Sequence, residues 1–350
     1  MIWIWRARTP GARLARLALL PAAAVFHVTA GARAKAYRSG WLPSSRLPAP
    51  SVAVGSLAVG GAGKTPLAAW IAGYYARSGL TPGILLRGYG GDEADVHRRA
   101  VPRAVVIEHA DRVRAARRAV ARGADVLVLD DAFQRLDVRR DLNVAVVSAE
   151  SLDAAPWTLP AGPWRESWRA LRRADLVVVT VKSAGEARVR ATIERVRAAG
   201  RRPVAVARLR LARLRGLLSE RERVPAELVG SRVLAGAGIA DPEAFAAQLR
   251  EYAATVALLT WRDHHRFVRA DVARMLSAAK EVDYVVVTAK DASKLRGLWP
   301  RDAAEPLVAE LEVVWQEGHK EVERALSAAV GGDVTGMTRR RGSIFTSPVC

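Results

Sequence analysis

The chain has 350 residues, of which 50% are apolar, so it is long enough for two domains with hydrophobic cores and too apolar for an intrinsically disordered chain. Its single cysteine, Cys350, excludes an internal disulfide, and its formal net charge of +20 favours a polyanionic partner: nucleic acid, an anionic membrane surface or a phosphorylated substrate. A general bias toward arginine explains part of this excess but not its distribution. No acidic residue precedes Asp92.

The first 45 residues have the composition of a membrane-associated helix. An apolar run at 17–31 is flanked on both sides by basic residues, and Trp3, Trp5 and Trp41 are available as interfacial anchors. The run is shorter than the roughly 20 residues that a spanning helix needs. We therefore favour a helix that lies in the headgroup region; a short membrane span and a cleaved targeting peptide are the alternatives.

The body of the chain predicts an α/β fold whose larger part is a P-loop NTPase-like parallel sheet domain. Continuous apolar strands alternate with helical segments at 46–202, the pattern of a parallel sheet covered on both faces. The expected elements there are strands 51–54, 84–86, 126–129, 144–147 and 176–180, with helices 66–77 and 112–122. A hinge strand at 203–230 then leads to a second, smaller α/β domain at 231–304.

The second domain repeats this alternation on a smaller scale. Its expected elements are strands 233–235, 255–259 and 284–288, with helices 242–250, 270–280 and 292–298. A strand at 307–314, within a return segment at 305–330, is expected to pair with the alternating strand at 204–211. The tail at 331–350 has the composition of a disordered segment.

A phosphate-binding loop stands between the first strand and its helix. Successive glycines turn backbone N–H groups toward phosphate oxygens at the positive end of the helix. In this pattern Lys64 reaches the β- and γ-phosphates of ATP, and the Thr65 hydroxyl coordinates Mg²⁺. The loop departs from the usual pattern at Ala58, where a glycine is expected. The residues expected to hold the nucleotide are Gly60, Gly61, Ala62, Gly63, Lys64, Thr65 and Pro66.

Carboxylates follow two other strands. Asp130 and Asp131 end the apolar strand at 126–129, at the sheet edge where ligands bind, and are expected in the Mg²⁺ shell. Asp92 and Glu93 follow a glycine-rich loop and are expected to emerge at the same edge, where we place Glu93 with the metal. A solvated turn is the alternative for this second pair.

The second domain contributes one candidate catalytic group, His264, in the sequence Asp263-His264-His265. Across a cleft from a carboxylate, a histidine can remove the proton of a hydroxyl group. Paired histidines are also common in surface loops, and the residues around these two do not make up a zinc site.

Together these segments resemble the tetraacyldisaccharide 4′-kinases of lipid A biosynthesis over 37–298. The resemblance implies a kinase that transfers the γ-phosphate of ATP to the 4′-hydroxyl of an acylated glucosamine disaccharide 1-phosphate, giving lipid IVA. It also implies a place on the cytoplasmic face of the bacterial inner membrane, peripheral or monotopic through the N-terminal helix. The motifs that carry the resemblance are Lys64-Thr65-Pro66, Arg87-Gly88-Tyr89-Gly90, Asp92-Glu93, Asp130-Asp131 with Gln134, 159–166, 237–239 and Asp263-His264.

The resemblance also assigns roles to single residues. It implies that Asp92 and His264 form the base that activates the hydroxyl, beside a catalytic Lys64. Positions near the phosphates or the substrate are Tyr89, Arg112, Gln134, Arg165 and Glu166. The chain departs from the family pattern at Ser56 (usually Asn), Ala94 (Pro), Ala132 (Gly), Arg135 (His) and Ala289 (Glu).

Two other functions compete with a lipid kinase. A P-loop ATPase that acts as a switch or assembly factor at the membrane shares the phosphate loop but needs no second domain with an Asp-His sequence. A nucleic-acid-binding ATPase is favoured by charge alone, and the sequence lacks the aromatic-and-basic strands or basic recognition helix that it needs. We therefore expect a membrane-surface kinase that works as a monomer and binds no nucleic acid.

Overall fold

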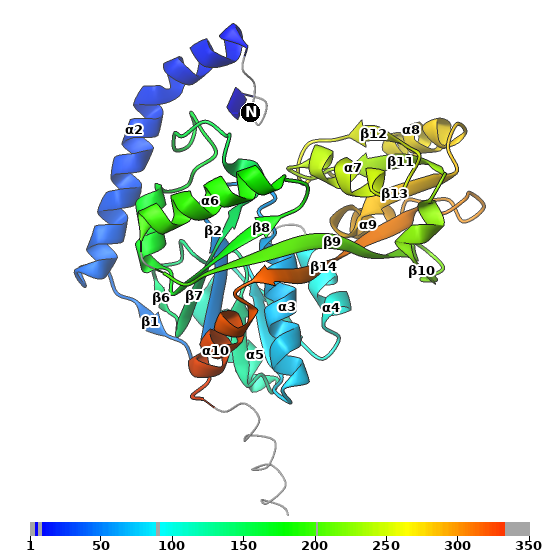
Figure 1. The fold of residues 1–350 in the computed structure, drawn as a ribbon. Coiled ribbons are helices and arrows are strands. Elements are labelled where there is room, and N and C mark those ends of the chain that lie inside the picture. Colours follow the sequence, from blue (N-terminus) through cyan, green and yellow to red (C-terminus); the bar gives the residue numbers. More distant parts are fainter. Residues whose placement is uncertain (1–3, 6–8, 89–91, 201, 333–350) are drawn as a thin grey trace, which may run out of the picture.

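The structure is a computed structural model that describes residues 4–5, 9–88, 92–200 and 202–332 (Figure 1). The expectation for the tail falls almost wholly on 333–350, which lie outside the described residues. The α-helices are α2 (Pro10–Arg38), α3 (Lys64–Arg77), α4 (Asp92–Ala100), α5 (Arg112–Ala121), α6 (Glu186–Ala199), α7 (Pro242–Arg250), α8 (Arg269–Ala279), α9 (Ala289–Leu295) and α10 (His319–Ala329).

The strands are numbered in the same way. They are β1 (Ser45–Arg46), β2 (Ser51–Ser56), β3 (Pro82–Leu86), β4 (Val105–Glu108), β5 (Val126–Leu129), β6 (Val138–Arg139), β7 (Leu142–Ser148), β8 (Leu176–Val181), β9 (Val204–Gly216), β10 (Glu222–Arg223), β11 (Arg232–Ala237), β12 (Thr255–Thr260), β13 (Tyr284–Thr288) and β14 (Leu307–Glu317). Short 3-10 helices lie at Ala149–Ser151, Trp168–Arg173 and Pro225–Leu228.

Within the described residues, twelve strands form one sheet of order β12-β11-β13-β14-β9-β8-β7-β2-β5-β3-β4, with β10 paired to β9 off this path. The strands from β9 to β4 are parallel, as are those from β12 to β14, and the two sets meet at the antiparallel pair β9–β14. We call the part built on 46–202 the core lobe and the part built on 231–304 the second lobe.

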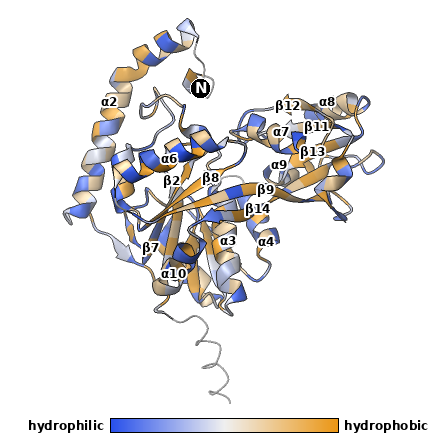
Figure 2. Ribbon diagram, in the orientation of Figure 1, coloured by the Kyte–Doolittle hydropathy of each residue, from blue (hydrophilic) through white to orange (hydrophobic). Residues whose placement is uncertain are grey.

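The core strands bury both faces, which explains their continuous apolar sequences. Val52 and Val54 of β2 pack with α3, α4 and α10, whereas Ala53 between them packs with α5 on the other face. Helix α6 covers that second face over β7 and β8. Strand β8 is hydrophobic over most of its length in Figure 2, as expected for a strand that helices cover on both faces.

Two long strands connect the lobes. β9 and β14 pair from Gly216 and Leu307 at one end to Val206 and Glu317 at the other, and they run from the core lobe to the second lobe in Figure 1. The predicted pairing of the strand at 307–314 with the earlier alternating strand is therefore confirmed, and both strands are longer than expected. Much of the segment expected as a hinge is β9 itself.

Several elements of the core lobe have no predicted counterpart, among them α4, β4 and α6. Helix α4 buries only Asp92, Ala94 and His97, so its sequence shows no apolar stripe by which to predict it. β4 is short and lies at the edge of the sheet. The result matters for the site, because Asp92 begins a helix and does not lie in a solvated turn.

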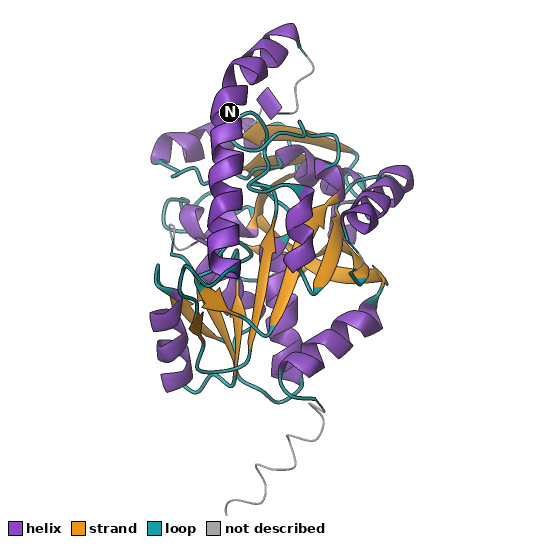
Figure 3. Ribbon diagram, turned by 90° about the vertical axis from the view of Figure 1, so that its left-hand side faces the viewer, coloured by secondary structure: helices purple, strands orange, loops and turns teal. Residues whose placement is uncertain are grey.

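Helix α2 lies along the outside of the core lobe and projects beyond it at its N-terminal end (Figures 1 and 3). Thr9 caps it by accepting the backbone N–H of Ala12 at 3.3 Å, and Pro10 occupies its first turn. Its carbonyl at Ala23 accepts the Thr158 hydroxyl at 3.0 Å, which fastens the middle of the helix to the core lobe.

Much of α2 is exposed apolar surface. Leu14, Leu17, Val25 and Val28 are each at least 60% exposed. Among the described residues, α2 is the one helix long and apolar enough to cross a membrane by length and composition. The apolar run at 17–31 is shorter than a membrane span needs, but the helix itself has 29 residues and is long enough for one.

Candidate active site

The phosphate-binding loop joins the end of β2 to the first turn of α3. Gly60 (φ 102°) and Gly63 (φ 82°) adopt the left-handed conformation that favours glycine. A Cβ at Gly63 would also lie 2.5 Å from a neighbouring leucine side chain. The Thr180 hydroxyl, at the end of β8, donates to the Ala62 carbonyl at 2.8 Å and holds the loop against the sheet. Helix α3 then begins at Lys64 and directs its N-terminus at the loop.

Lys64 lies beside the carboxylates that follow β5. Its Nζ is 3.5 Å from Asp131 Oδ1 and 3.4 Å from Ser56 Oγ. Arg165 donates to Asp131 at 2.9 Å, and Gln134 donates to the Ser56 carbonyl at 3.1 Å. The structure thus brings together four residues that the sequence placed at the phosphates, the metal or the substrate: Lys64, Asp131, Gln134 and Arg165. Two cations face one partly exposed carboxylate, an arrangement that phosphate oxygens and a metal ion can enter.

Asp130 lies deeper than its neighbour. Its side chain is 2% exposed, and its Oδ2 is 3.0 Å from Nε2 of His97, which is itself fully buried. Burial would raise the pKa of Asp130, but the hydrogen bond and charge of His97, with the charge of Lys64, hold that pKa below its usual value. Asp130 is therefore an anion at neutral pH. His97 carries no sequence signal beyond its place in α4, and it was not predicted.

Arg112 is buried behind the end of β5. Its side chain is 1% exposed and donates to the carbonyls of Asp130 (3.3 Å) and His109 (3.2 Å). Burial lowers the pKa of the guanidinium to about 10. Arg112 thus lies against Asp130 at the expected phosphate and metal site, and its role near the phosphates or the substrate stays a prediction.

The residues at this edge fit a magnesium ion. Thr65 lies in the first turn of α3, and the carboxylates of Asp130 and Asp131 follow β5, the strand next to β2. Hydroxyl and carboxylate oxygens are the donors that Mg²⁺ prefers, and the ion usually keeps several waters or phosphate oxygens as well. In the part of the chain that the structure describes, no group of three or more His, Cys, Asp or Glu side chains could hold a metal by itself.

A second cluster forms where the two lobes meet. Asp92, at the start of α4, is 2% exposed, and its Oδ2 lies 2.9 Å from Lys294 Nζ and 3.4 Å from His264 Nδ1. Burial would raise the pKa of Asp92, but the hydrogen bonds from His264 and Lys294, with the charges of Lys294 and Lys290, outweigh it and hold that pKa well below its usual value. The two residues expected to act as one base are thus in contact.

His264 occupies an unusual backbone position on the second lobe. Its φ of 57° is left-handed, and its N–H donates to the Gly238 carbonyl at 3.2 Å. The hydrogen bond with Asp92 raises the pKa of His264, while burial and the charge of Lys290 oppose the rise. About half of the side chain is exposed, so the imidazole can meet a ligand in the cleft.

The remaining predicted residues have other partners. Glu93 Oε1 is 2.6 Å from Lys290 Nζ, so its predicted place in the metal shell requires that ion pair to open. Glu166 accepts from Arg173 at 2.8 Å. Tyr89 lies outside the described residues. At the position where the family pattern has histidine, Arg135 donates to Asp137 at 2.7 and 3.0 Å.

A hollow of about 130 Å³ lies beside the phosphate loop, between the lobes. Gly60 and Gly61 line it from the core lobe, and Asp241 and Asp263 line it from the second lobe. Asp241 is also 3.4 Å from Nζ of Lys182, which follows β8. The cleft is therefore bridged by ion pairs on two sides, here and at Asp92.

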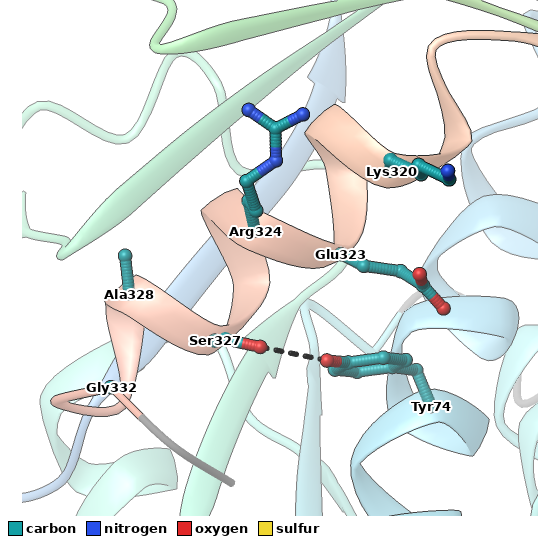
Figure 4. A pocket seen from close by; sticks show the side chains of 7 residues that line it. All are labelled: Tyr74, Lys320, Glu323, Arg324, Ser327, Ala328 and Gly332. Carbon is teal, nitrogen blue, oxygen red and sulfur yellow. Dashed lines mark hydrogen bonds between the residues drawn. The ribbon is translucent and has the colours of Figure 1, made fainter.

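A larger and more open hollow of about 680 Å³ lies between α3 and α10 (Figure 4). The hydroxyls of Tyr74 and Ser327 are 2.8 Å apart there. Tyr74 stands ten residues after Lys64, about 15 Å along the helix axis. This hollow is too far from the phosphate loop to belong to the same site.

The fold and the loop define a P-loop phosphotransferase. The sequence profile of the tetraacyldisaccharide-1-P 4′-kinase family matches residues 15–101 and 90–331. A tetraacyldisaccharide 4′-kinase of Anaeromyxobacter sp. is 38% identical over 359 residues, which cover 94% of each chain. One from Aromatoleum aromaticum is 34% identical and covers 83% of this chain and 87% of that one.

A solved structure has the same fold. It is the "apo" form of LpxK from Aquifex aeolicus in complex with ATP, with a TM-score of 0.69 at 22% identity over 90% of this chain and 99% of that chain. From the family profile and the relatives, the chain belongs to the tetraacyldisaccharide 4′-kinase family, and it is a kinase of lipid A biosynthesis.

Proposed function

We propose that this kinase transfers the γ-phosphate of ATP to the 4′-hydroxyl of a tetraacylated glucosamine disaccharide 1-phosphate and so gives lipid IVA, phosphorylated at both ends. The acceptor follows from the family, whose members are named for it. The observation that carries the proposal is the contact between Asp92 and His264, whose neighbour Asp263 lines the same hollow as the phosphate loop. A switch ATPase needs no group that removes a proton from an acceptor hydroxyl.

The donor end binds and neutralises the triphosphate. The backbone of 60–65 holds the phosphates, and Lys64 leaves Asp131 for the β- and γ-phosphates. Thr65 with Asp130 and Asp131 would hold Mg²⁺, which neutralises the charge that develops on the transferred phosphoryl group.

The acceptor end activates the hydroxyl. Nδ1 of His264 faces Asp92, so Nε2 is the atom that takes the proton of the 4′-hydroxyl. As the proton leaves, the hydroxyl oxygen bonds to the γ-phosphorus, and the bond from that phosphorus to the bridging oxygen of ADP breaks. Asp92 orients the imidazole and stabilises the imidazolium that forms, as carboxylates do for catalytic histidines.

The membrane brings the enzyme to its lipid. The exposed apolar side chains of α2 and of Trp157, 47% exposed beside the Thr158 contact to α2, support a surface that enters the lipid interface. The excess of arginine attracts the anionic headgroups of the cytoplasmic leaflet, where ATP is available. The protein is expected to work as a monomer, with its basic charge serving lipid and phosphate and not nucleic acid.

The direct test is a transfer assay. Purified protein is incubated with γ-labelled ATP, Mg²⁺ and the disaccharide 1-phosphate in detergent, and the lipid is separated from ATP. Label in a bisphosphorylated lipid is the expected result. ATP hydrolysis without labelled lipid would instead favour the switch ATPase.

A further inference from the structure

Helix α9 contributes three charged side chains to the contact between the lobes. It follows β13 directly, and Thr288 caps it by accepting the backbone N–H of Asp291 at 3.2 Å. Lys290, Asp291 and Lys294 lie within its seven residues. Positions 290 and 294 are four apart and therefore lie on the same helix face.

The two lysines pair with the first two residues of α4. Lys294 Nζ is 2.9 Å from Asp92, and Lys290 Nζ is 2.6 Å from Glu93. The pair at Asp92 is the more buried one: the Lys294 and Asp92 side chains are 15% and 1% exposed, against 30% and 33% for Lys290 and Glu93. A buried carboxylate that loses its cation is strongly destabilised, so Asp92 depends on Lys294 for its position and its charge.

Asp291 acts on the other member of the catalytic pair. Its Oδ2 accepts the Gly238 N–H at 2.9 Å and the Thr288 hydroxyl at 2.7 Å. The carbonyl of Gly238 in turn accepts the N–H of His264, the residue with left-handed backbone. Asp291 is fully buried, so this chain of hydrogen bonds fixes the loop that presents the imidazole.

We propose that Lys294 and Asp291 are positioning residues for phosphoryl transfer, with Lys294 holding the Asp92 carboxylate and Asp291 holding the His264 loop from the same helix. Since Asp92 and His264 come from different lobes, the distance between them depends on how α9 packs against α4. The assignment rests on the proposed transfer to a hydroxyl. It differs from a merely structural role for α9, which would keep the lobes together without acting on the rate of the chemical step.

Lys294→Met tests the assignment, because it keeps the length of the side chain and removes the charge. We expect kcat to fall by about tenfold to 10²-fold, the loss that follows a misplaced catalytic group, while KM for ATP stays unchanged. Lys294→Arg restores the cation and should recover most of the loss. Lys280→Met, an exposed lysine after α8 in the same lobe, is the matched control and should behave as the wild type.

A double variant separates positioning from simple closure of the lobes. Because Lys294 acts through Asp92, Asp92→Asn combined with Lys294→Met should be no slower than Asp92→Asn alone. If the kcat losses of the two single variants multiply in the double variant, the assignment is overturned. It is also overturned if Lys294→Met has a normal kcat and raised KM values. If the wild-type protein fails to label the lipid, the proposed function itself is contradicted. If the wild type labels the lipid and only the variants depart from expectation, the assignment of Lys294 alone is overturned.

Asp291→Ala provides an independent arm, checked for folding by its melting curve. A folded Asp291→Ala protein should lose about tenfold to 10²-fold in kcat. The double variant Asp291→Ala with His264→Ala should be no slower than His264→Ala alone. A folded Asp291→Ala protein with normal kcat would overturn the assignment of Asp291 and leave that of Lys294 to its own variants.

Discussion

The two ends of the candidate active site are built in different ways. At the nucleotide end, the functional residues follow β2 and β5, which are neighbours in one sheet, and the loop conformation is set by local glycines. At the acceptor end, Asp92 comes from the core lobe and His264 and Lys294 from the second lobe. The first end therefore forms with the core sheet, whereas the second exists only when α9 seats on α4.

The ion pairs at the two ends also differ in how exposed their carboxylates are. Asp131, the partner of Lys64, is 35% exposed, so an incoming triphosphate can replace it. The side chain of Asp92 is 1% exposed and is held by two groups of the second lobe. We conclude that one end is arranged to exchange its partner on nucleotide binding, and the other to keep its partners while the reaction proceeds.

The largest effect is expected from Lys64→Ala at the nucleotide end. The developing charge on the phosphoryl group loses a fixed cation, and transfer should be abolished. The same transfer assay measures it, with the exposed Lys320→Ala of α10 as the control. Normal turnover by a folded Lys64→Ala protein would show that the loop around Gly63 is not the site of transfer.

A smaller effect, in pH dependence, is expected at the acceptor end. His264 must be neutral to accept a proton, and Asp92 raises its pKa, so kcat/KM should rise with pH through a value above the usual histidine value of about 6.5. Asp92→Asn removes the carboxylate charge, which lowers the pKa of His264 and moves this acid limb to lower pH. If kcat/KM rises at the same pH in the wild type and in Asp92→Asn, His264 is not the group that titrates.

The smallest effect on the chemistry is expected from α2. Replacing Leu14, Leu17, Val25 and Val28 together by Ser removes apolar side chains that would each contribute roughly 1.5–3 kcal/mol of burial in lipid. Sedimentation with anionic vesicles should drop, while kcat in detergent stays unchanged. Leu311→Ser, an exposed apolar residue of β14, is the control. Unchanged sedimentation would place the membrane contact elsewhere.

The same contrast decides what the sequence could predict. The strand at Val126–Leu129 and the helix at Pro242–Arg250 were predicted at their observed bounds, because an apolar run and a proline with a following amphipathic segment are local signals. The phosphate loop was found for the same reason. The contact of Asp92 with His264 came only from the family resemblance, since no local pattern joins residues so far apart.

Other residues had no usable signal. Lys294 is one lysine in a charged helix, and its importance appears only when α9 meets α4. Arg112 was named from the family resemblance alone, and its burial and its hydrogen bonds to backbone carbonyls have no signal in the sequence. Burial of this kind depends on the packing of the whole lobe, which sequence periodicity does not report.

The most direct test of the account is the cycle of Asp92→Ala, His264→Ala and the double variant, with kcat measured at saturating ATP and lipid. Each single variant should lose roughly 10²–10⁴-fold in kcat with little change in ATP affinity, the range expected for general acid–base groups. The double variant should be scarcely slower than the slower single variant, because the two residues act as one unit across the lobes. Losses that multiply, or a nearly normal His264→Ala, would contradict the claim that the lobes assemble a single base.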